Sequence, residues 1–441
     1  ADQDLHDARL STWFALERWA EVGQGGGEVT WLRRDRDSLS AYEVLAVQGP
    51  DPGSARPREL WFSSATGLLD REVSARDAGS VLSRYLDWRR VGARWHAFRT
   101  QTSVSNMPAN TLEQVVDSLT IDVPLHGVSF SPPDSTTANP LQWLRTPGRA
   151  TLPFEYRARH VWLRASIAGG PLEDVLFDTG ASVTVLDSSY AATHGIATEG
   201  FMQAAGAGAA GSASFATLPA LEVRGPSGDG VRVRDLHVAV LSVSPQFAPY
   251  FGRPLVAVLG YDVISRLVST LDFDHGVLTL QDPAAATISA NATALPMIMN
   301  GTVPTVSGTL DGHEGLFRLD IGSSSTVDVH APFVRAHDLE RTLRGGIEVA
   351  GAGFGGDFNS RVGRARRLTL GPFGWDDPMV VLTRATEGAF ASDEFAGNIG
   401  NRLLERFTVT LDYEHRRVLL APGREMRRRD GFTRSGLMLQ W

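Results

Sequence analysis

Two short motifs each place an aspartate and a glycine directly after a run rich in apolar residues. The first, residues 178–182, reads Asp-Thr-Gly-Ala-Ser, and the second, residues 320–324, reads Asp-Ile-Gly-Ser-Ser. Two carboxylates held about 3 Å apart cannot both ionise, so such a pair shares one proton and supplies a base and an acid together. The base can deprotonate water, and the acid can protonate a peptide carbonyl and then the leaving amine. Asp178 and Asp320 are therefore the predicted catalytic pair of a hydrolase.

The elements that would position this pair are repeated once between about residues 157 and 422. The two aspartates lie 142 residues apart, and three further segments recur in the same order at nearly the same offset. They are 205–208 with 350–353, 259–260 with 399–400, and 270–275 with 410–415. Most of the repeated segments alternate as β-strands do. The repeat predicts two homologous β-rich lobes, each of which contributes one aspartate to a site that neither lobe can form alone.

These motifs, in this order, resemble those of aspartic peptidases, and most closely bacterial two-lobed retropepsin-like or pepsin-like proteases with a LolA-like N-terminal domain. The resemblance implies a mainly β fold: a two-lobed acid-protease β-barrel fold, preceded by an α+β antiparallel-sheet (LolA-like) domain. It also implies an aspartic endopeptidase whose partner is a polypeptide substrate. The LolA-like part of the resemblance rests on aromatic and β-branched runs between residues 59 and 100.

Neighbours of the aspartates are expected to support the pair. Glycine lacks a Cβ, so Gly180 and Gly322 would let the two loops approach closely. The resemblance implies that the hydroxyl of Thr179 bonds across to the opposite loop, which Ile321 cannot do, so half of that network should be missing. Ser323 can donate to Asp320, whereas Ala181 cannot donate to Asp178, which predicts Asp320 as the more readily ionised member. Ser182 completes the predicted supporting set.

Each predicted lobe has one glycine-rich segment, 206–211 in the first and 351–356 in the second. Each lies between the aspartate and the later repeated segment, 259–260 or 399–400, where the family carries its flap hairpin. The candidates for contact with substrate are Gly206, Gly208, Gly211, Gly351, Gly353 and Phe354. Both segments also match G-x-G-x-x-G, the dinucleotide-binding pattern, which requires a helix directly after the glycines. Polar or β-patterned residues follow instead, so flap-like turns are the favoured interpretation.

Composition removes several other classes of site. The chain contains neither cysteine nor lysine, which excludes disulfides, thiolate nucleophiles, cysteine-ligated metals and Schiff-base chemistry. The formal net charge is −8, and no long basic stretch occurs, which argues against nucleic-acid binding. No apolar run approaches the roughly 20 residues needed for a transmembrane helix. We therefore expect no cofactor, no metal, no nucleic-acid partner and no transmembrane segment.

The predicted organisation has four parts. Residues 1–140 form the accessory domain, with an opening helix at 3–22 and a polar linker at 131–137, and the lobes occupy 151–285 and 297–423. Short strands are expected in the accessory domain at 42–47, 59–63, 68–73, 83–88 and 95–100, which predicts an antiparallel meander. Residues 424–441 form a basic tail that could lead into a PDZ-like domain. Because the chain starts at Ala1, a removed signal peptide and a periplasmic or secreted location are expected.

Two alternatives stay open at this point. Ile321 and the accessory domain also fit a catalytically inactive pseudopeptidase that binds peptide or lipid between the lobes or in the N-terminal domain. The accessory domain could instead be a pro-segment that covers the site. The sequence does not indicate an oligomeric state.

Overall fold

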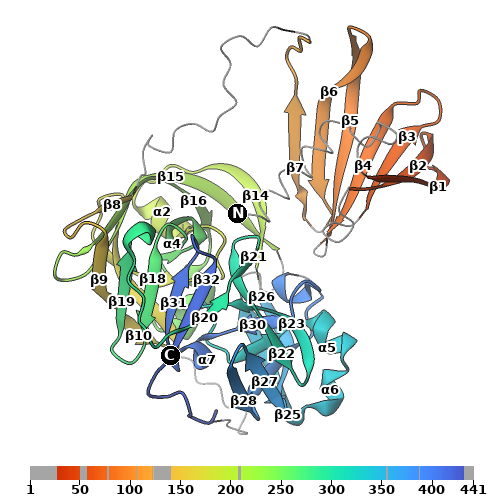
Figure 1. Cartoon of the computed structure of the whole chain (residues 1–441). Coiled ribbons are helices and arrows are strands. Elements are labelled where there is room, and N and C mark those ends of the chain that lie inside the picture. The colour runs from red at the N-terminus through yellow and green to blue at the C-terminus, as the bar shows by residue number, and fades with distance from the viewer. Residues whose placement is uncertain are drawn as a thin grey trace. The chain divides into compact units, whose positions relative to one another are not determined.

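The computed structural model describes residues 27–49, 57–76, 79–105, 107–121, 123, 141–206, 210–353, 356–386 and 388–431. The chain divides into two compact units, residues 1–131 and 132–441 (Figure 1). The expected helix 3–22, the linker 131–137, Gly208, Phe354 and the last ten residues lie outside the described part.

The first unit contains one antiparallel sheet of seven strands, each paired with the next along the chain. The strands are β1 (Glu28–Arg36), β2 (Ala41–Gln48), β3 (Arg58–Ser63), β4 (Leu69–Arg76), β5 (Gly79–Val91), β6 (Arg94–Val104) and β7 (Met107–Val115). The predicted meander is confirmed for β2 to β6. The first and last strands were not predicted, and their exposed apolar side chains, such as Trp31 and Leu112, explain why no clear inward-facing pattern marks them.

A nine-stranded sheet forms the body of the first lobe, in the order β10-β11-β12-β17-β13-β16-β15-β14, with β8 beside β16. Its strands are β8 (Leu141–Trp143), β10 (Glu155–Arg157), β11 (His160–Ile167), β12 (Leu172–Phe177), β13 (Val185–Asp187), β14 (Glu199–Ala205), β15 (Ala210–Arg224), β16 (Gly230–Leu241) and β17 (Ala257–Leu259). Three short helices connect them: α2 (Ser188–Thr193), α3 (Ser244–Phe251) and α4 (Tyr261–Ile264).

A ten-stranded sheet forms the second lobe, in the order β25-β26-β29-β24-β30-β23-β22-β27-β28, with β21 beside β22. Its strands are β21 (Ile298–Asn300), β22 (Val303–Leu310), β23 (His313–Leu319), β24 (Val327–Val329), β25 (Arg344–Gly353), β26 (Gly356–Arg364), β27 (Arg367–Leu370), β28 (Phe373–Asp376), β29 (Met379–Thr383) and β30 (Gly397–Ile399). The helical elements are α5 (Ala331–Ala336), α6 (Leu339–Thr342), η3 (Ala389–Ala391) and α7 (Asn401–Leu404).

The same topology occurs in both lobes. β12 pairs in parallel with β17, as β23 does with β30, and β13 pairs in parallel with β16, as β24 does with β29. Each lobe also carries an antiparallel hairpin, β14–β15 in the first and β25–β26 in the second. The duplication read from the sequence is therefore a duplication of structure, and the chain has the mainly β fold that was predicted.

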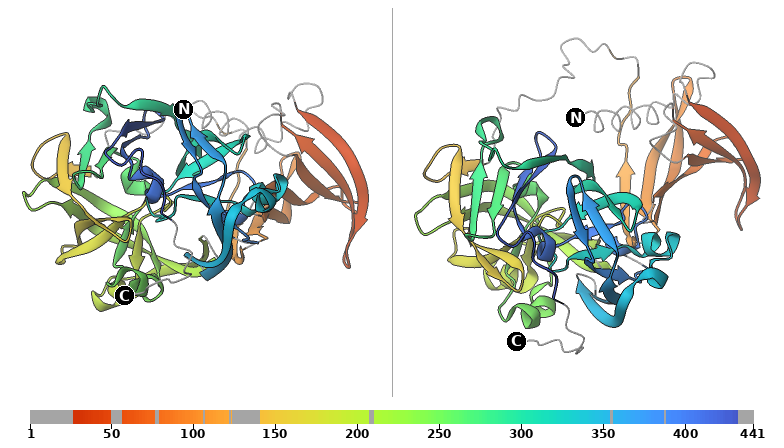
Figure 2. Two further views of the ribbon diagram at one scale, coloured as in Figure 1. Left: turned by 90° about the horizontal axis from the view of Figure 1, so that it is seen from below. Right: turned by 60° about the horizontal axis from the view of Figure 1, so that its bottom comes forward.

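A six-stranded sheet joins the lobes, in the order β20-β32-β31-β18-β19-β9. Three of its strands belong to the first half of the repeat, β9 (Arg149–Pro153), β18 (Val268–Asp272) and β19 (Val277–Gln281), and three to the second, β20 (Thr293–Pro296), β31 (Phe407–Asp412) and β32 (Arg417–Pro422). At its centre the repeated residues Thr270 and Thr410 face each other, with their hydroxyl oxygens 2.9 Å apart. Figure 2 shows the two halves of the repeat, coloured from yellow to green and from green to blue, in two further views. This sheet makes the two lobes one unit.

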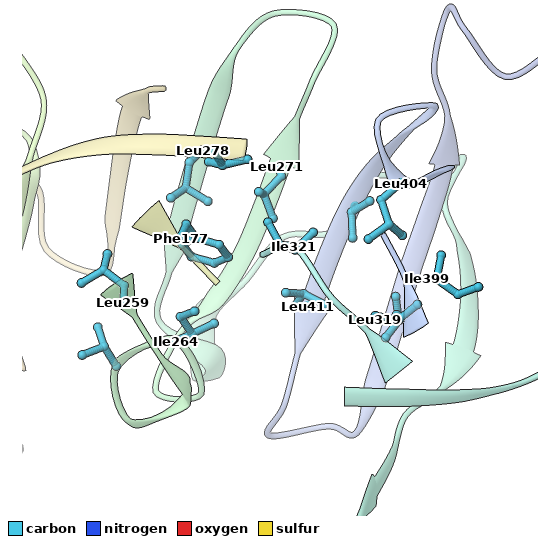
Figure 3. Packing of buried hydrophobic residues seen from close by; sticks show 14 of the residues in the cluster. Phe177, Leu259, Ile264, Leu271, Leu278, Leu319, Ile321, Ile399, Leu404 and Leu411 are labelled. Carbon is cyan, nitrogen blue, oxygen red and sulfur yellow. The ribbon is translucent and has the colours of Figure 1, made fainter. Parts of the chain in front are cut away.

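The hydrophobic core is continuous through both lobes. Phe177, Leu259 and Leu271 from the first half and Leu319 and Leu411 from the second belong to the same buried cluster (Figure 3). Ile321 lies between these two groups and is only 1% exposed. An isoleucine can replace the expected hydroxyl residue there because the position is enclosed by apolar side chains.

The described part of the expected tail lies against the lobes. The amide of Arg424 donates to Asp274 at 2.9 Å, and Arg406 and Asp430 form a buried ion pair. Arg428 also pairs with Glu405, so ion pairs and hydrogen bonds hold this part of the basic tail to the lobes. No described helix is long and apolar enough to cross a membrane.

Candidate active site

The two predicted aspartates follow equivalent strands of their lobes and are held by equivalent backbone hydrogen bonds. The amide of Asp178, just beyond β12, donates to the carbonyl of Leu259 at 3.1 Å, and the amide of Asp320, just beyond β23, donates to that of Ile399 at 2.9 Å. Each bond extends a parallel strand pair by one residue, so each aspartate is held by a sheet before its loop begins. The structure thereby brings the two carboxyl groups together, and their side chains share a hydrogen bond.

Two glycines make this approach possible. The amide of Gly180 donates to Oδ1 of Asp178 at 2.7 Å, and that of Gly322 donates to Oδ1 of Asp320 at 3.0 Å. A Cβ on Gly180 would lie 2.7 Å from Oδ1 of Asp320, and a Cβ on Gly322 would lie 2.2 Å from Cγ of Asp178. Each glycine therefore faces the carboxylate of the opposite lobe, and a side chain at either position would push the carboxyl groups apart.

The surroundings favour a proton on Asp178. Desolvation by the surrounding protein, followed by repulsion from Asp320, raises the pKa of Asp178 to about 7, against weaker opposing effects from the Gly180 amide and Arg318. Asp320 instead accepts a hydrogen bond at Oδ2 from the side-chain amide of Asn398, at 2.9 Å. A donor of this kind favours the ionised form of its acceptor. The surroundings of the two carboxyl groups are therefore unequal: burial favours the protonated form of Asp178, and Asp320 receives a side-chain donor.

Thr179 links the loops across the lobe boundary. Its hydroxyl donates to the carbonyl of Leu319 at 2.6 Å and accepts from the amide of Ile321 at 2.9 Å. The threonine is completely buried. Ile321, the equivalent residue of the second lobe, has no hydroxyl and cannot form the corresponding hydrogen bonds to the first lobe. The loops are therefore linked by the side chain of Thr179 on one side, and the other side is apolar.

The sequence analysis missed a second link between the lobes. Asn401, at the start of α7, donates from Nδ2 to the carbonyl of Ile321 at 2.6 Å and to that of Arg159, in the first lobe, at 2.7 Å. The ring of His160 also lies near the backbone of Gly322, across the boundary. The loop of Asp320 is therefore anchored to the first lobe through its backbone. Its signal in the sequence was weak: Asn401 directly follows the recognised pair Ile399-Gly400.

The role expected for Ser323 is wrong. Its hydroxyl donates to Oδ2 of Asp328 at 3.1 Å, and Ser325 donates to Oδ1 of the same residue at 2.7 Å. Asp328 is buried on β24, directly behind the loop, and burial raises its pKa to about 6. The serine hydroxyl is thus engaged with a second carboxyl group that the sequence did not place near the site. Ser182 is exposed, and no described contact joins it to either aspartate.

Asn398, which donates to Asp320, is itself oriented by a hydrogen bond to a buried histidine. Oδ1 of Asn398 lies 3.0 Å from Nε2 of His330, which is completely buried. Burial lowers the pKa of His330 to about 4, so the ring is neutral near pH 7. While Nδ1 lies 3.3 Å from the carbonyl oxygen of Ser392, the tautomer protonated at Nε2 donates to the amide oxygen. This contact fixes the orientation of the Asn398 amide, so that its NH₂ group points at Asp320. Neither residue was identified from the sequence, although Asn398 is a polar residue in an otherwise apolar strand.

The glycine-rich segments lie at the ends of the two hairpins. Gly206 follows β14, Gly211 pairs with Ala204 within the first hairpin, and Gly351 and Gly353 lie in β25. Since both segments connect antiparallel strands, the dinucleotide-binding interpretation, which needs a following helix, does not apply.

Each hairpin end contacts the opposite lobe. The carbonyl of Gly206 accepts from the amide of Ala389, on η3, at 2.9 Å. The carbonyl of Gly353 accepts from the side chain of Gln246, on α3, at 2.5 Å. Because α3 and η3 follow the equivalent strands β16 and β29, the two contacts repeat the symmetry of the lobes.

Comparison with known proteins gives one family match. The family model described as aspartyl protease matches residues 163–263, from β11 to α4, a segment that contains Asp178. Among solved structures, an aspartic proteinase from Irpex lacteus is similar with a TM-score of 0.42 and 12% identity, over 64% of this chain and 99% of that chain. Basic 7S globulin from soybean is similar with a TM-score of 0.38 and 11% identity, over 62% and 95%. No curated protein matches the sequence. The family match supports a protease-type function.

Proposed function

We propose that the protein is an aspartic endopeptidase that cleaves peptide bonds with a water molecule activated by Asp178 and Asp320. The observation that carries this proposal is the hydrogen-bonded pair of carboxyl groups, each presented by one copy of a duplicated lobe and each faced by a glycine of the other copy. Like charges so close hold one proton between them, which is the state that acid–base hydrolysis requires.

The asymmetry of the site gives the two aspartates separate roles. Ionised Asp320 takes a proton from the water as its oxygen attacks the carbonyl carbon, while protonated Asp178 gives its proton to the carbonyl oxygen. The resulting gem-diol collapses when one hydroxyl returns a proton to Asp178 and the amine leaves with the proton held by Asp320. The C–N bond breaks, and the pair recovers its original single proton.

The hairpins β14–β15 and β25–β26 would cover the substrate in this scheme. Their contacts with Ala389 and Gln246 support a closed arrangement in which both hairpins bridge the lobes. Closure of this kind excludes bulk water from the reacting groups. The seven-stranded meander of residues 28–115 is compatible with the LolA-like accessory domain that the sequence predicts.

The test uses the full chain and an unfolded protein substrate, with cleavage followed between pH 3 and 8. We expect cleavage that pepstatin inhibits and that Asp178→Asn and Asp320→Asn each abolish. Asp338→Asn is the matched control, because it removes an exposed aspartate carboxylate of the second lobe. Absence of cleavage by a wild-type chain with normal circular dichroism, or cleavage that survives both active-site substitutions, would refute the proposal.

A further inference from the structure

In each lobe, three residues in register on neighbouring strands lie next to the aspartate. These three residues are apolar in the first lobe and polar in the second. In the first lobe Leu176, two residues before Asp178, is in register with Trp162 on β11 and Val258 on β17. All three side chains are buried in one apolar cluster. Residues in register on neighbouring strands project to the same face of the sheet, so this face is apolar beside Asp178.

The equivalent positions of the second lobe are all polar. Arg318, two residues before Asp320, is in register with Thr305 on β22 and Asn398 on β30. Thr305 and Asn398 are buried, and Asn398 bonds to Asp320. The duplication has thus kept the backbone arrangement and exchanged an apolar face for a polar one that carries a cation.

Arg318 lacks the partners that an enclosed arginine normally has. Its Nε is buried and has no hydrogen-bond partner in the described part of the chain. Its guanidinium carbon lies 5.4 Å from the ring centroid of Phe395, and Asp178, Asp320 and Glu394 act on it only through longer-range attraction. Arg318 as a whole is partly exposed, but a guanidinium nitrogen buried without a hydrogen-bond partner is costly, so its presence beside the two aspartates calls for a ligand that satisfies it.

A carboxylate is the ligand that fits best. The guanidinium group is planar, permanently charged and able to donate two parallel hydrogen bonds to a carboxylate. A peptide lying across the aspartates would place side chains on both sides of the scissile bond. One side would meet the apolar face of Leu176, and the other would meet Arg318.

We propose that Arg318 determines specificity by binding a substrate carboxylate next to the scissile bond, on the side of the second lobe. The inference rests on the proposed peptidase function and adds a substrate class: chains with an acidic residue on one side of the cleaved bond and an apolar residue on the other. The carboxylate comes either from an aspartate or glutamate side chain or from the end of a chain.

The first measurement compares matched peptides that have Glu, Gln or Leu at the position facing Arg318, with that position read from the cleavage sites in an unfolded protein. We expect kcat/KM to be about 10- to 100-fold higher for Glu than for Gln, as for hydrogen bonds to charged groups. A further pair of peptides ends at this position with a free carboxylate or an amide, which separates the two sources of the ligand.

The substitution Arg318→Met should reduce the ratio of kcat/KM for the Glu peptide to kcat/KM for the Gln peptide to below about 3. The same holds for the free-carboxylate and amide peptides, and the Gln peptide should still be cleaved. Methionine imitates the apolar side chain at the equivalent position of the first lobe and should fold. Arg367→Gln is the control, because Arg367 is exposed in the same lobe and pairs with Asp376. If Arg318 served only to balance the charge of the aspartates, its loss would change the pH profiles of all peptides equally.

Two results overturn the inference: cleavage without preference for a carboxylate at this position, or a preference that Arg318→Met leaves unchanged. If the wild-type chain cleaves nothing, the proposed function fails, and binding then decides the inference. Fluorescence polarisation with labelled Glu and Gln peptides would show tighter binding of Glu by the wild type but not by Arg318→Met. Equal binding of both peptides by the wild type would refute the carboxylate site itself.

Discussion

Replacement of Thr179 by valine tests the physical basis of the link between the lobes. Valine has nearly the same shape, so the change removes the hydroxyl and leaves packing almost intact. The carbonyl of Leu319 and the amide of Ile321 then lose their partners in a fully buried region. With about 1–2 kcal/mol for each buried group that loses its hydrogen bond, we expect the free energy of unfolding to fall by about 2–4 kcal/mol.

A suitable control lies in the second lobe. Thr326 is also fully buried, but its hydroxyl has no partner in the described part of the chain, so Thr326→Val should change stability little or raise it slightly. Urea unfolding of the full chain would be monitored by hydrogen exchange in peptides that cover β12 and β23. These peptides report the unfolding of the two lobes separately from that of the meander. If the free energies of unfolding of Thr179→Val and Thr326→Val differ by less than about 0.5 kcal/mol, the usual effect of a surface substitution, the reasoning is refuted.

Three further predictions concern the proposed catalytic pair. The pKa of Asp178 is raised to about 7 from 3.8, so the folded chain binds more protons than the unfolded chain between these values. Stability should therefore fall as the pH rises from about 4 to 7, and urea unfolding of Asp178→Asn should lack this contribution. Asn398→Leu should lower kcat/KM for peptide cleavage, because Oδ2 of Asp320 loses the side-chain amide that holds it in place. Gly322→Ala should abolish peptide cleavage through its clash with Asp178, whereas Gly431→Ala, where a Cβ meets nothing within 4 Å, should not.

The internal repeat is the reason that much of the fold could be predicted from the sequence. Two copies of one strand order imply two sheets of the same topology, and the positions of Asp178 and Asp320 in those copies imply that they meet at the boundary. The facing of Thr270 and Thr410 in the sheet between the lobes shows the same symmetry in the structure. Local sequence patterns could also indicate the meander, because each of its strands pairs with the next along the chain.

Contacts that depend on distant elements could not be predicted in this way. Ser323 has two carboxyl groups within reach of its loop, and only the position of β24 decides that its hydroxyl donates to Asp328. Asn401 links Ile321 to Arg159 because three separate segments converge at the lobe boundary. A repeat predicts which backbone positions correspond, but the partner of a polar side chain depends on the neighbouring strands that surround it.

The exchange of an apolar face for a polar one explains how a duplicated lobe yields an unequal pair. Perfect symmetry would give both aspartates the same surroundings and the same affinity for the shared proton. In this chain Asp320 receives the Asn398 amide, while the position equivalent to Asn398 beside Asp178 is Val258, which can donate nothing. Since Asn398 also lies in register with Arg318, the residue that distinguishes the two aspartates is on the same face as the residue proposed to select the substrate. Substitution of Arg318 is therefore expected to change the specificity, and substitution of Asn398 the hydrogen bonding of Asp320, although both side chains are on one face.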